Sequence, residues 1–172
     1  MRVNRWSPFA PPATLFLRSE SLAKGLRDWP EFDGEVLGGN YHGYRGKKSK
    51  TFVRAAEGAC ERPIMTGVGT DEFRVFGSLY ETLPLAESTT TLLYGRTEDL
   101  KPHEPVAWTN RRANGGKVFY TSLGHPGDFD LPDFQKLLRN AVYWAADLTI
   151  PVGQKLGLLP KKTALAPAPS GR

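Results

Sequence analysis

Two histidines stand in settings where an imidazole could transfer a proton or bind a polar ligand. His42 lies in the loop Gly39-Asn40-Tyr41-His42-Gly43, whose glycines allow the backbone to come close to a ligand. His125 follows Gly124 at the end of an apolar run. An imidazole changes charge near neutral pH, so each could be a proton donor, a hydrogen-bond donor or a metal ligand. Each could equally be a structural histidine that satisfies a loop carbonyl.

Polar and aromatic neighbours of these histidines are candidate substrate-binding residues. Tyr41 and Tyr44 flank His42 and could stack on a sugar ring, and Asn40 stands beside them. Asp128 follows His125 by three positions. Asp128 and Asp130 also precede a helical pattern, where a negative charge favours the helix N-terminus, and Asp130 is the expected N-cap.

Other kinds of site find little support. His103, between Pro102 and Glu104, is expected to be structural or neutral. No third ligand has a metal-binding spacing relative to the two histidines, so no metal or other cofactor is assigned, and a divalent metal stays open without support. The single cysteine, Cys60, lies in a loop-like context away from any histidine in sequence. Nucleophile triads, phosphate-binding loops and dinucleotide fingerprints are absent from the sequence.

The composition predicts one folded domain. The chain has 172 residues, 40% of them hydrophobic and 24% charged. The net charge of +5 is dispersed, and the tight cluster Lys47, Lys48 and Lys50 is either a solvated loop or an anion-binding patch. Because aromatic residues do not interleave with this cluster in the pattern of a nucleic-acid-binding module, nucleic acid is not an expected partner. No apolar run reaches the ~20 residues of a membrane span. Residues 1–24 lack a signal-peptide core, and localisation and oligomeric state stay open.

Local patterns predict the elements that would position these side chains. A helix at 21–29 should end before Pro30, and Gly38-Gly39 should form a turn. Strands are expected at 51–54, at 89–94 (closed by Gly95), at 106–109 and at 118–121, with a long hairpin loop between the last two. The apolar rhythm over 131–147 predicts an amphipathic helix that covers one sheet face.

Six segments, taken in order, resemble the ThuA-like (trehalose utilisation) family of the class I glutamine amidotransferase-like superfamily. They fall between about residues 22 and 148 and are DWPEFDGEVLGGNYHGY, RPIMTGV, GSLYETLPL, EPVAWTN, KVFYTSLGHPGDF and LLRNAVYWA. No single segment is specific, but the ordered set is. The resemblance implies an α/β fold of the flavodoxin-like or class I glutamine amidotransferase-like kind. That fold has three layers, an open parallel sheet and helices on both faces, with ligands outside the carboxyl ends of the strands.

The resemblance also implies a role in carbohydrate metabolism. The expected ligand is a small carbohydrate, a sugar or keto-sugar derivative, with His42 and His125 in acid/base chemistry of the hydrolase or isomerase type. Tyr80 matches the family's Asp-Glu-Leu-Tyr-like stretch and joins the substrate-binding candidates, although Ser78 replaces the acidic residue there. Glutaminase activity is not expected, because no activated cysteine is evident. The alternatives are a non-catalytic carbohydrate-binding module and a non-functional gene fragment.

The ends of the chain differ from the segment between them. Residues 1–21 are atypical, residues 22–148 form the C-terminal portion of a ThuA-like domain, and residues 149–172 form a tail rich in Pro, Ala and Lys. The resemblance implies that the sheet is incomplete and lacks N-terminal strands, which would make the chain marginally stable or prone to aggregate. We hypothesise that residues 1 to about 17 are an out-of-frame reading, which the upstream nucleotide sequence would test.

Overall fold

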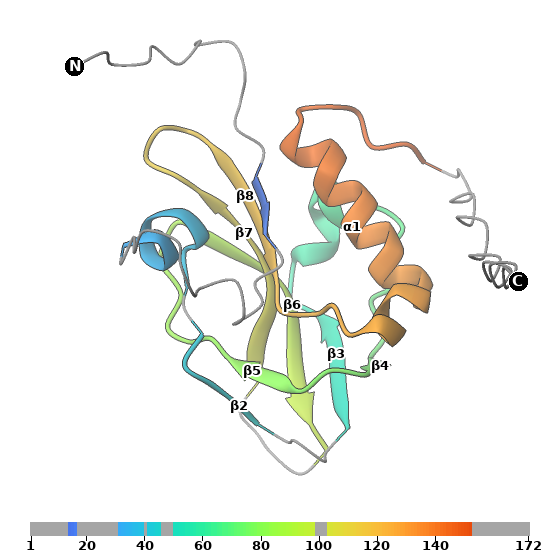
Figure 1. The fold of residues 1–172 in the computed structure, drawn as a ribbon. Coiled ribbons are helices and arrows are strands. Elements are labelled where there is room, and N and C mark those ends of the chain that lie inside the picture. The colour runs from blue at the N-terminus through green and yellow to red at the C-terminus, as the bar shows by residue number, and fades with distance from the viewer. Residues whose placement is uncertain (1–13, 17–30, 40, 46–49, 99–102, 153–172) are drawn as a thin grey trace, which may run out of the picture.

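A computed structural model describes residues 14–16, 31–39, 41–45, 50–98 and 103–152, and its main feature is a six-stranded sheet (Figure 1). The strand order is β1-β8-β7-β6-β3-β4, and a separate ribbon pairs β2 with β5. The strands are β1 (Thr14–Phe16), β2 (Gly43–Arg45), β3 (Thr51–Ala55), β4 (Phe73–Val75), β5 (Leu79–Glu81), β6 (Thr89–Thr97), β7 (Glu104–Arg111) and β8 (Lys117–Thr121).

Most strand pairs in this sheet are antiparallel, which corrects the expectation of a parallel sheet. Only β1 and β8 pair in parallel among the described strands, while β3, β4, β6, β7 and β8 pair antiparallel with their neighbours. Short links explain the direction of two of these pairs, β6–β7 and β7–β8. Residues 98–103 join β6 to β7 and residues 112–116 join β7 to β8. A parallel crossover needs a dozen residues or more, so such links connect antiparallel strands.

All four predicted strands are present, and one of them continues beyond its expected end. β6 runs through Gly95 to Thr97, so the prediction that Gly95 closes the strand is wrong. A Cβ atom at position 95 would lie 2.6 Å from Leu79 Cδ1 and 2.7 Å from Val106 Cγ1. The glycine is therefore a site of close packing within the strand rather than its terminus.

One face of the sheet is covered by α1 (Pro132–Ala145) and by the short 3₁₀ helices η3 (Ala59–Glu61) and η4 (Pro63–Met65) (Figure 1). The predicted helix is thus confirmed. Its buried Phe134, Leu137 and Ala141 join the main core. Asn140, also buried, donates from Nδ2 to the carbonyl oxygens of Ile64 (3.0 Å) and Thr66 (2.9 Å), which ties α1 to η4.

The start of α1 differs from its expected cap. Its N-cap is Leu131, whose extended backbone (φ −80°, ψ 120°) precedes Pro132 and whose side chain makes no capping bond. Asp130 instead ends η5, a 3₁₀ helix over Pro126–Asp130. The prediction of Asp130 as N-cap is therefore wrong, because the 3₁₀ helix takes up the residues up to Asp130 and leaves Leu131 at the junction.

The opposite face carries a second, smaller core under η2 (Asp33–Leu37), a single π-helical turn. Trp108 is buried there, stacks on Tyr120 (4.0 Å between ring centroids) and donates from Nε1 to the carbonyl oxygen of Leu37 (2.7 Å). The predicted turn after η2 is confirmed: Gly38 has φ +78° and lies against Thr89 and Asn110. The chain has an α/β fold in which the sheet is packed on both faces.

Several expectations fall outside the described residues, namely the helix at 21–29, Asn40, the pair Lys47 and Lys48, and the tail beyond 152. The described start of that tail, residues 149–152, has neither helix nor strand. β1 lies inside the atypical segment 1–21. None of the described helices has both the length and the apolar character needed to span a bilayer.

Candidate functional site

His125 lies on an exposed turn directly after the sheet. β8 ends at Thr121, and Gly124 then adopts φ +151°, a conformation that residues with a Cβ rarely take. His125 follows and becomes the N-cap of η5. Its Nδ1 accepts a hydrogen bond from the backbone N–H of Gly127 (3.1 Å). The neutral ring therefore carries its proton on Nε2, the atom that is left to meet a ligand.

Asp128 holds this turn in place. Its side chain is fully buried, and Oδ2 accepts hydrogen bonds from the backbone N–H groups of Gly124 and His125, both at 3.0 Å. Oδ1 accepts from the backbone N–H of Phe76, at 2.8 Å, just beyond β4. Asp128 was expected to act on the helix dipole or on a substrate. In the structure its oxygens are bound by the backbone, so Asp128 is a positioning residue for the His125 turn.

The hydrogen bond from the backbone N–H of Phe76 to Asp128 places the aromatic ring of Phe76 beside His125. The rings of Phe76 and His125 stack with centroids 5.9 Å apart and planes inclined by 22°. Phe76 remains 51% exposed, so much of its ring is open to solvent. Gly127 makes room for it, since a Cβ there would lie 2.9 Å from the ring. We call Phe76 and His125 the ring platform. Sequence reasoning missed Phe76, which lies in the bend Phe76-Gly77 without any motif of its own.

His42 lies at the start of the β2–β5 ribbon, where it is exposed. Its backbone N–H donates to the carbonyl oxygen of Glu81 (3.0 Å). The three tyrosine candidates do come together around this ribbon. Tyr44 is the cross-strand partner of Tyr80, and the Tyr41 and Tyr80 rings meet edge to face at 4.9 Å.

The two histidines lie against opposite ends of β5. His42 contacts the end at Glu81, whereas the Cβ of His125 is 3.8 Å from the position a Cβ would take on Gly77. The backbone from Gly77 to Glu81 covers at most about 14 Å when fully extended. The two histidines therefore lie at opposite ends of one short strand, which carries Tyr80.

Glu72, an acidic residue just before β4, forms an ion pair with Arg96. Glu72 is engaged on the outer face of the sheet, where its oxygens accept from Arg96 Nη2 (2.6 Å) and Nε (2.8 Å). These hydrogen bonds lower the pKa of Glu72 below its ordinary value, and the positive charges of Arg96, Arg54 and His103 act in the same direction. Within the described ranges, no group of three or more His, Cys, Asp or Glu side chains is arranged to hold a metal ion.

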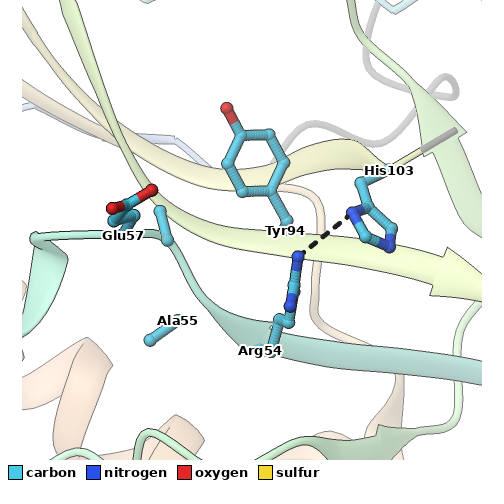
Figure 2. A pocket seen from close by; sticks show the side chains of 6 residues that line it. Arg54, Ala55, Glu57, Tyr94 and His103 are labelled. Carbon is cyan, nitrogen blue, oxygen red and sulfur yellow. Dashed lines mark hydrogen bonds between the residues drawn. The ribbon is translucent and has the colours of Figure 1, made fainter.

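A cavity of about 340 Å³ opens on β3 and β6, away from both candidate histidines (Figure 2). It includes His103, which was expected to be structural or neutral. Arg54 Nη2 donates to His103 Nδ1 over 3.4 Å, and Tyr94 is the cross-strand partner of Arg54. No sequence motif marks this cavity, because its members come from three separate segments. The lining residues are Arg54, Ala55, Ala56, Glu57, Tyr94 and His103.

The fold and this geometry define a class of protein: an α/β protein with a histidine on a turn at the end of a central strand. Within that class the family follows from comparison with known proteins. The model of the ThuA family, described as trehalose utilisation, matches residues 20–145, most of the chain. The protein belongs to the ThuA family. No curated protein matches the chain.

Proposed function

We propose that this ThuA-family protein binds a sugar or keto-sugar derivative on the ring platform and that His125 exchanges a proton with it. Membership in a family described by trehalose utilisation suggests the carbohydrate class. The observation that carries the proposal is the stacked pair of Phe76 and His125, with Phe76 half exposed and the turn held by a buried carboxylate.

The chemistry of a sugar suits such a platform. The C–H face of a pyranose ring packs on an exposed aromatic ring, while its hydroxyl or carbonyl oxygens need a hydrogen-bonding group at the edge. His125 supplies that group through Nε2, because Nδ1 is occupied by the Gly127 N–H. A general acid or base must lie within about 3 Å of the atom that it protonates. A rigid turn helps to keep that distance.

The β2–β5 ribbon extends the proposed site. Tyr41, Tyr44 and Tyr80 offer aromatic and hydroxyl groups, and His42 offers a second imidazole at the far end of β5. In this proposal the ribbon binds the remainder of the ligand, and His42 is the second candidate for proton transfer.

Kinetics on histidine variants test the proposal. Turnover and binding should be measured with trehalose, glucose and their keto derivatives for the wild type, His42→Ala, His125→Ala and the double variant. His125→Ala should lower kcat about 10²- to 10⁴-fold, the usual contribution of a general acid or base. Phe76→Ala should raise KM about threefold to tenfold, with kcat less affected. His103→Gln is the matched control, because it changes a histidine outside the proposed site.

Each outcome bears on one part of the proposal. Turnover that persists in the double variant would remove proton transfer from both histidines. Binding without turnover, if weakened by Phe76→Ala, would favour the second candidate function, a non-catalytic carbohydrate-binding module. The exposed aromatic residues of the platform support that alternative as well.

A further inference from the structure

We infer that the cavity on β3 and β6 is a second binding site, which takes a small hydroxylated ligand that carries a carboxylate or phosphate group. It shares no lining residue with the ring platform or with the His42 ribbon. The inference stands on the geometry of the cavity and does not depend on the proposed function.

One end of the cavity is cationic. Arg54 and the buried Val53 alternate along β3, so the Arg54 side chain points away from the main core. Its guanidinium donates to His103 Nδ1, which leaves Nε2 of a neutral His103 as a hydrogen-bond donor. Figure 2 shows the two side chains meeting at the same end of the cavity. The remaining N–H groups of the guanidinium, which His103 holds at this end of the cavity, suit the oxygens of a carboxylate or phosphate.

The positive charge at this end is available to a ligand. Among the residues that the structure describes, no carboxylate lies within salt-bridge distance of Arg54 or His103. Glu72 lies near enough for the charge of Arg54 to lower its pKa, but its oxygens are already bound by Arg96. An incoming anion would therefore meet the remaining guanidinium N–H donors without displacing an ion pair.

The other end of the cavity favours hydroxyl groups. In Figure 2 the Tyr94 ring stands between the Arg54–His103 pair and the Glu57 carboxylate. A carboxylate repels a second anion but accepts hydrogen bonds from hydroxyl groups, and the phenol of Tyr94 can both donate and accept. A ligand with an acidic group at one end and hydroxyl groups at the other, such as a sugar acid or sugar phosphate, matches this order of charges. A cavity of about 340 Å³ is within the range for small ligands.

Calorimetric titration of the full chain in low-salt buffer tests the inference. The probes are gluconate, glucose 6-phosphate, inorganic phosphate and glucose. Gluconate or glucose 6-phosphate should bind saturably and at least about tenfold more tightly than glucose. Arg54→Gln should weaken that binding about tenfold to a hundredfold, the worth of one or two charge-assisted hydrogen bonds.

Three variants give the controls. Arg74→Gln removes the same charge from the neighbouring strand, where Arg74 lies over Phe76 at 5.8 Å and does not line the cavity, so it should weaken binding less than about threefold. Glu57→Gln should lower the affinity for glucose 6-phosphate relative to that for inorganic phosphate. His125→Gln should leave the affinity for inorganic phosphate unchanged, because phosphate has no sugar ring to pack on the ring platform, and this separates the cavity from the ring platform. Circular dichroism and thermal unfolding would establish that each variant is folded.

The contrary results are equally distinct. The inference fails if no acidic probe binds saturably, if glucose binds as tightly as gluconate, or if Arg54→Gln and Arg74→Gln weaken binding to the same extent. Inorganic phosphate binding as tightly as glucose 6-phosphate would overturn the assigned ligand class, because the hydroxyl end would then contribute nothing.

Discussion

Asp128 shows how a single buried carboxylate can position a surface histidine. It accepts three backbone hydrogen bonds, two from the His125 turn and one from Phe76. Those bonds determine both where His125 stands and which ring lies beside it. A carboxylate is suited to this role because it only accepts, whereas a neutral amide of the same shape would turn a donor toward one of the three N–H groups.

Removal of this carboxylate should be costly. Asp128→Ala would leave three N–H donors without their partner, and we expect the free energy of unfolding to fall by about 2–4 kcal/mol. Urea denaturation followed by circular dichroism measures the change. Asp130→Ala is the matched control, since Asp130 is exposed and caps nothing, and it should stay within about 0.5 kcal/mol of the wild type. Equal effects of the two variants would contradict the role given to Asp128.

Glu72 gives the molecule a pH dependence whose direction can be worked out. Hydrogen bonds from Arg96 hold the pKa of Glu72 below its ordinary value of 4.5. The folded state therefore binds this proton less readily than the unfolded chain does. The stabilisation is complete above pH 4.5 and is lost as the pH falls through the lower folded pKa.

Comparison of the wild type with Glu72→Gln tests this direction. The variant should have the lower urea midpoint at pH 7, and the gap between the two should close as the pH falls through the folded pKa of Glu72, because the wild-type carboxyl group then becomes protonated. The difference should be small and should shrink in high salt, because the pair is partly exposed. A gap that widens at low pH would show that Glu72 is not stabilised by Arg96.

Among the elements, β6 is central because it pairs with both β3 and β7. Its continuation through Gly95 depends on the missing side chain, since Leu79 and Val106 fill the space above that residue. β6 can therefore extend as far as Thr97 and present Tyr94 and Arg96 on its outer face, beside Arg54 and Phe52 of β3.

A side chain at position 95 should disturb this packing. Gly95→Ala would bring a methyl group within 2.6–2.7 Å of Leu79 and Val106, and we expect a loss of about 1–3 kcal/mol in the free energy of unfolding. Gly34→Ala is the matched control: a Cβ there meets nothing within 4 Å, so the change should be neutral or slightly stabilising. The two substitutions can be compared by thermal unfolding. A neutral Gly95→Ala would mean that Leu79 and Val106 can move aside.

Taken as a whole, the molecule shows which features a single sequence can predict. Local apolar patterns were sufficient for the strands β3, β6, β7 and β8 and for α1, because periodicity involves only residues near one another in the chain. The hairpin predicted between β7 and β8 is confirmed, but the parallel direction expected for the rest of the sheet was wrong, since strand direction depends on the links between strands and on their pairing. His42 and His125 were identified from their loops, and their placement around one ligand stays a prediction.

The parts of the sites that escaped prediction are contacts between distant segments. Phe76 meets Asp128 across 52 positions, and Arg54 meets His103 across 49. Neither pair has a spacing that local structure would impose. An exposed arginine or phenylalanine on a strand is common and needs no explanation by itself. The role of these residues becomes evident only in the folded structure, where their distant partners lie beside them.

The bond between Phe76 and Asp128 has a consequence for the order of events during folding. It links the ends of β4 and β8, which are not neighbours in the sheet, so it closes a long loop of chain. The β6–β7–β8 meander has short connections and can assemble first at little entropic cost. The ring platform, which we propose as the sugar-binding surface, is then completed late in folding. A newly made chain would therefore fold most of its sheet before it could bind the ligand.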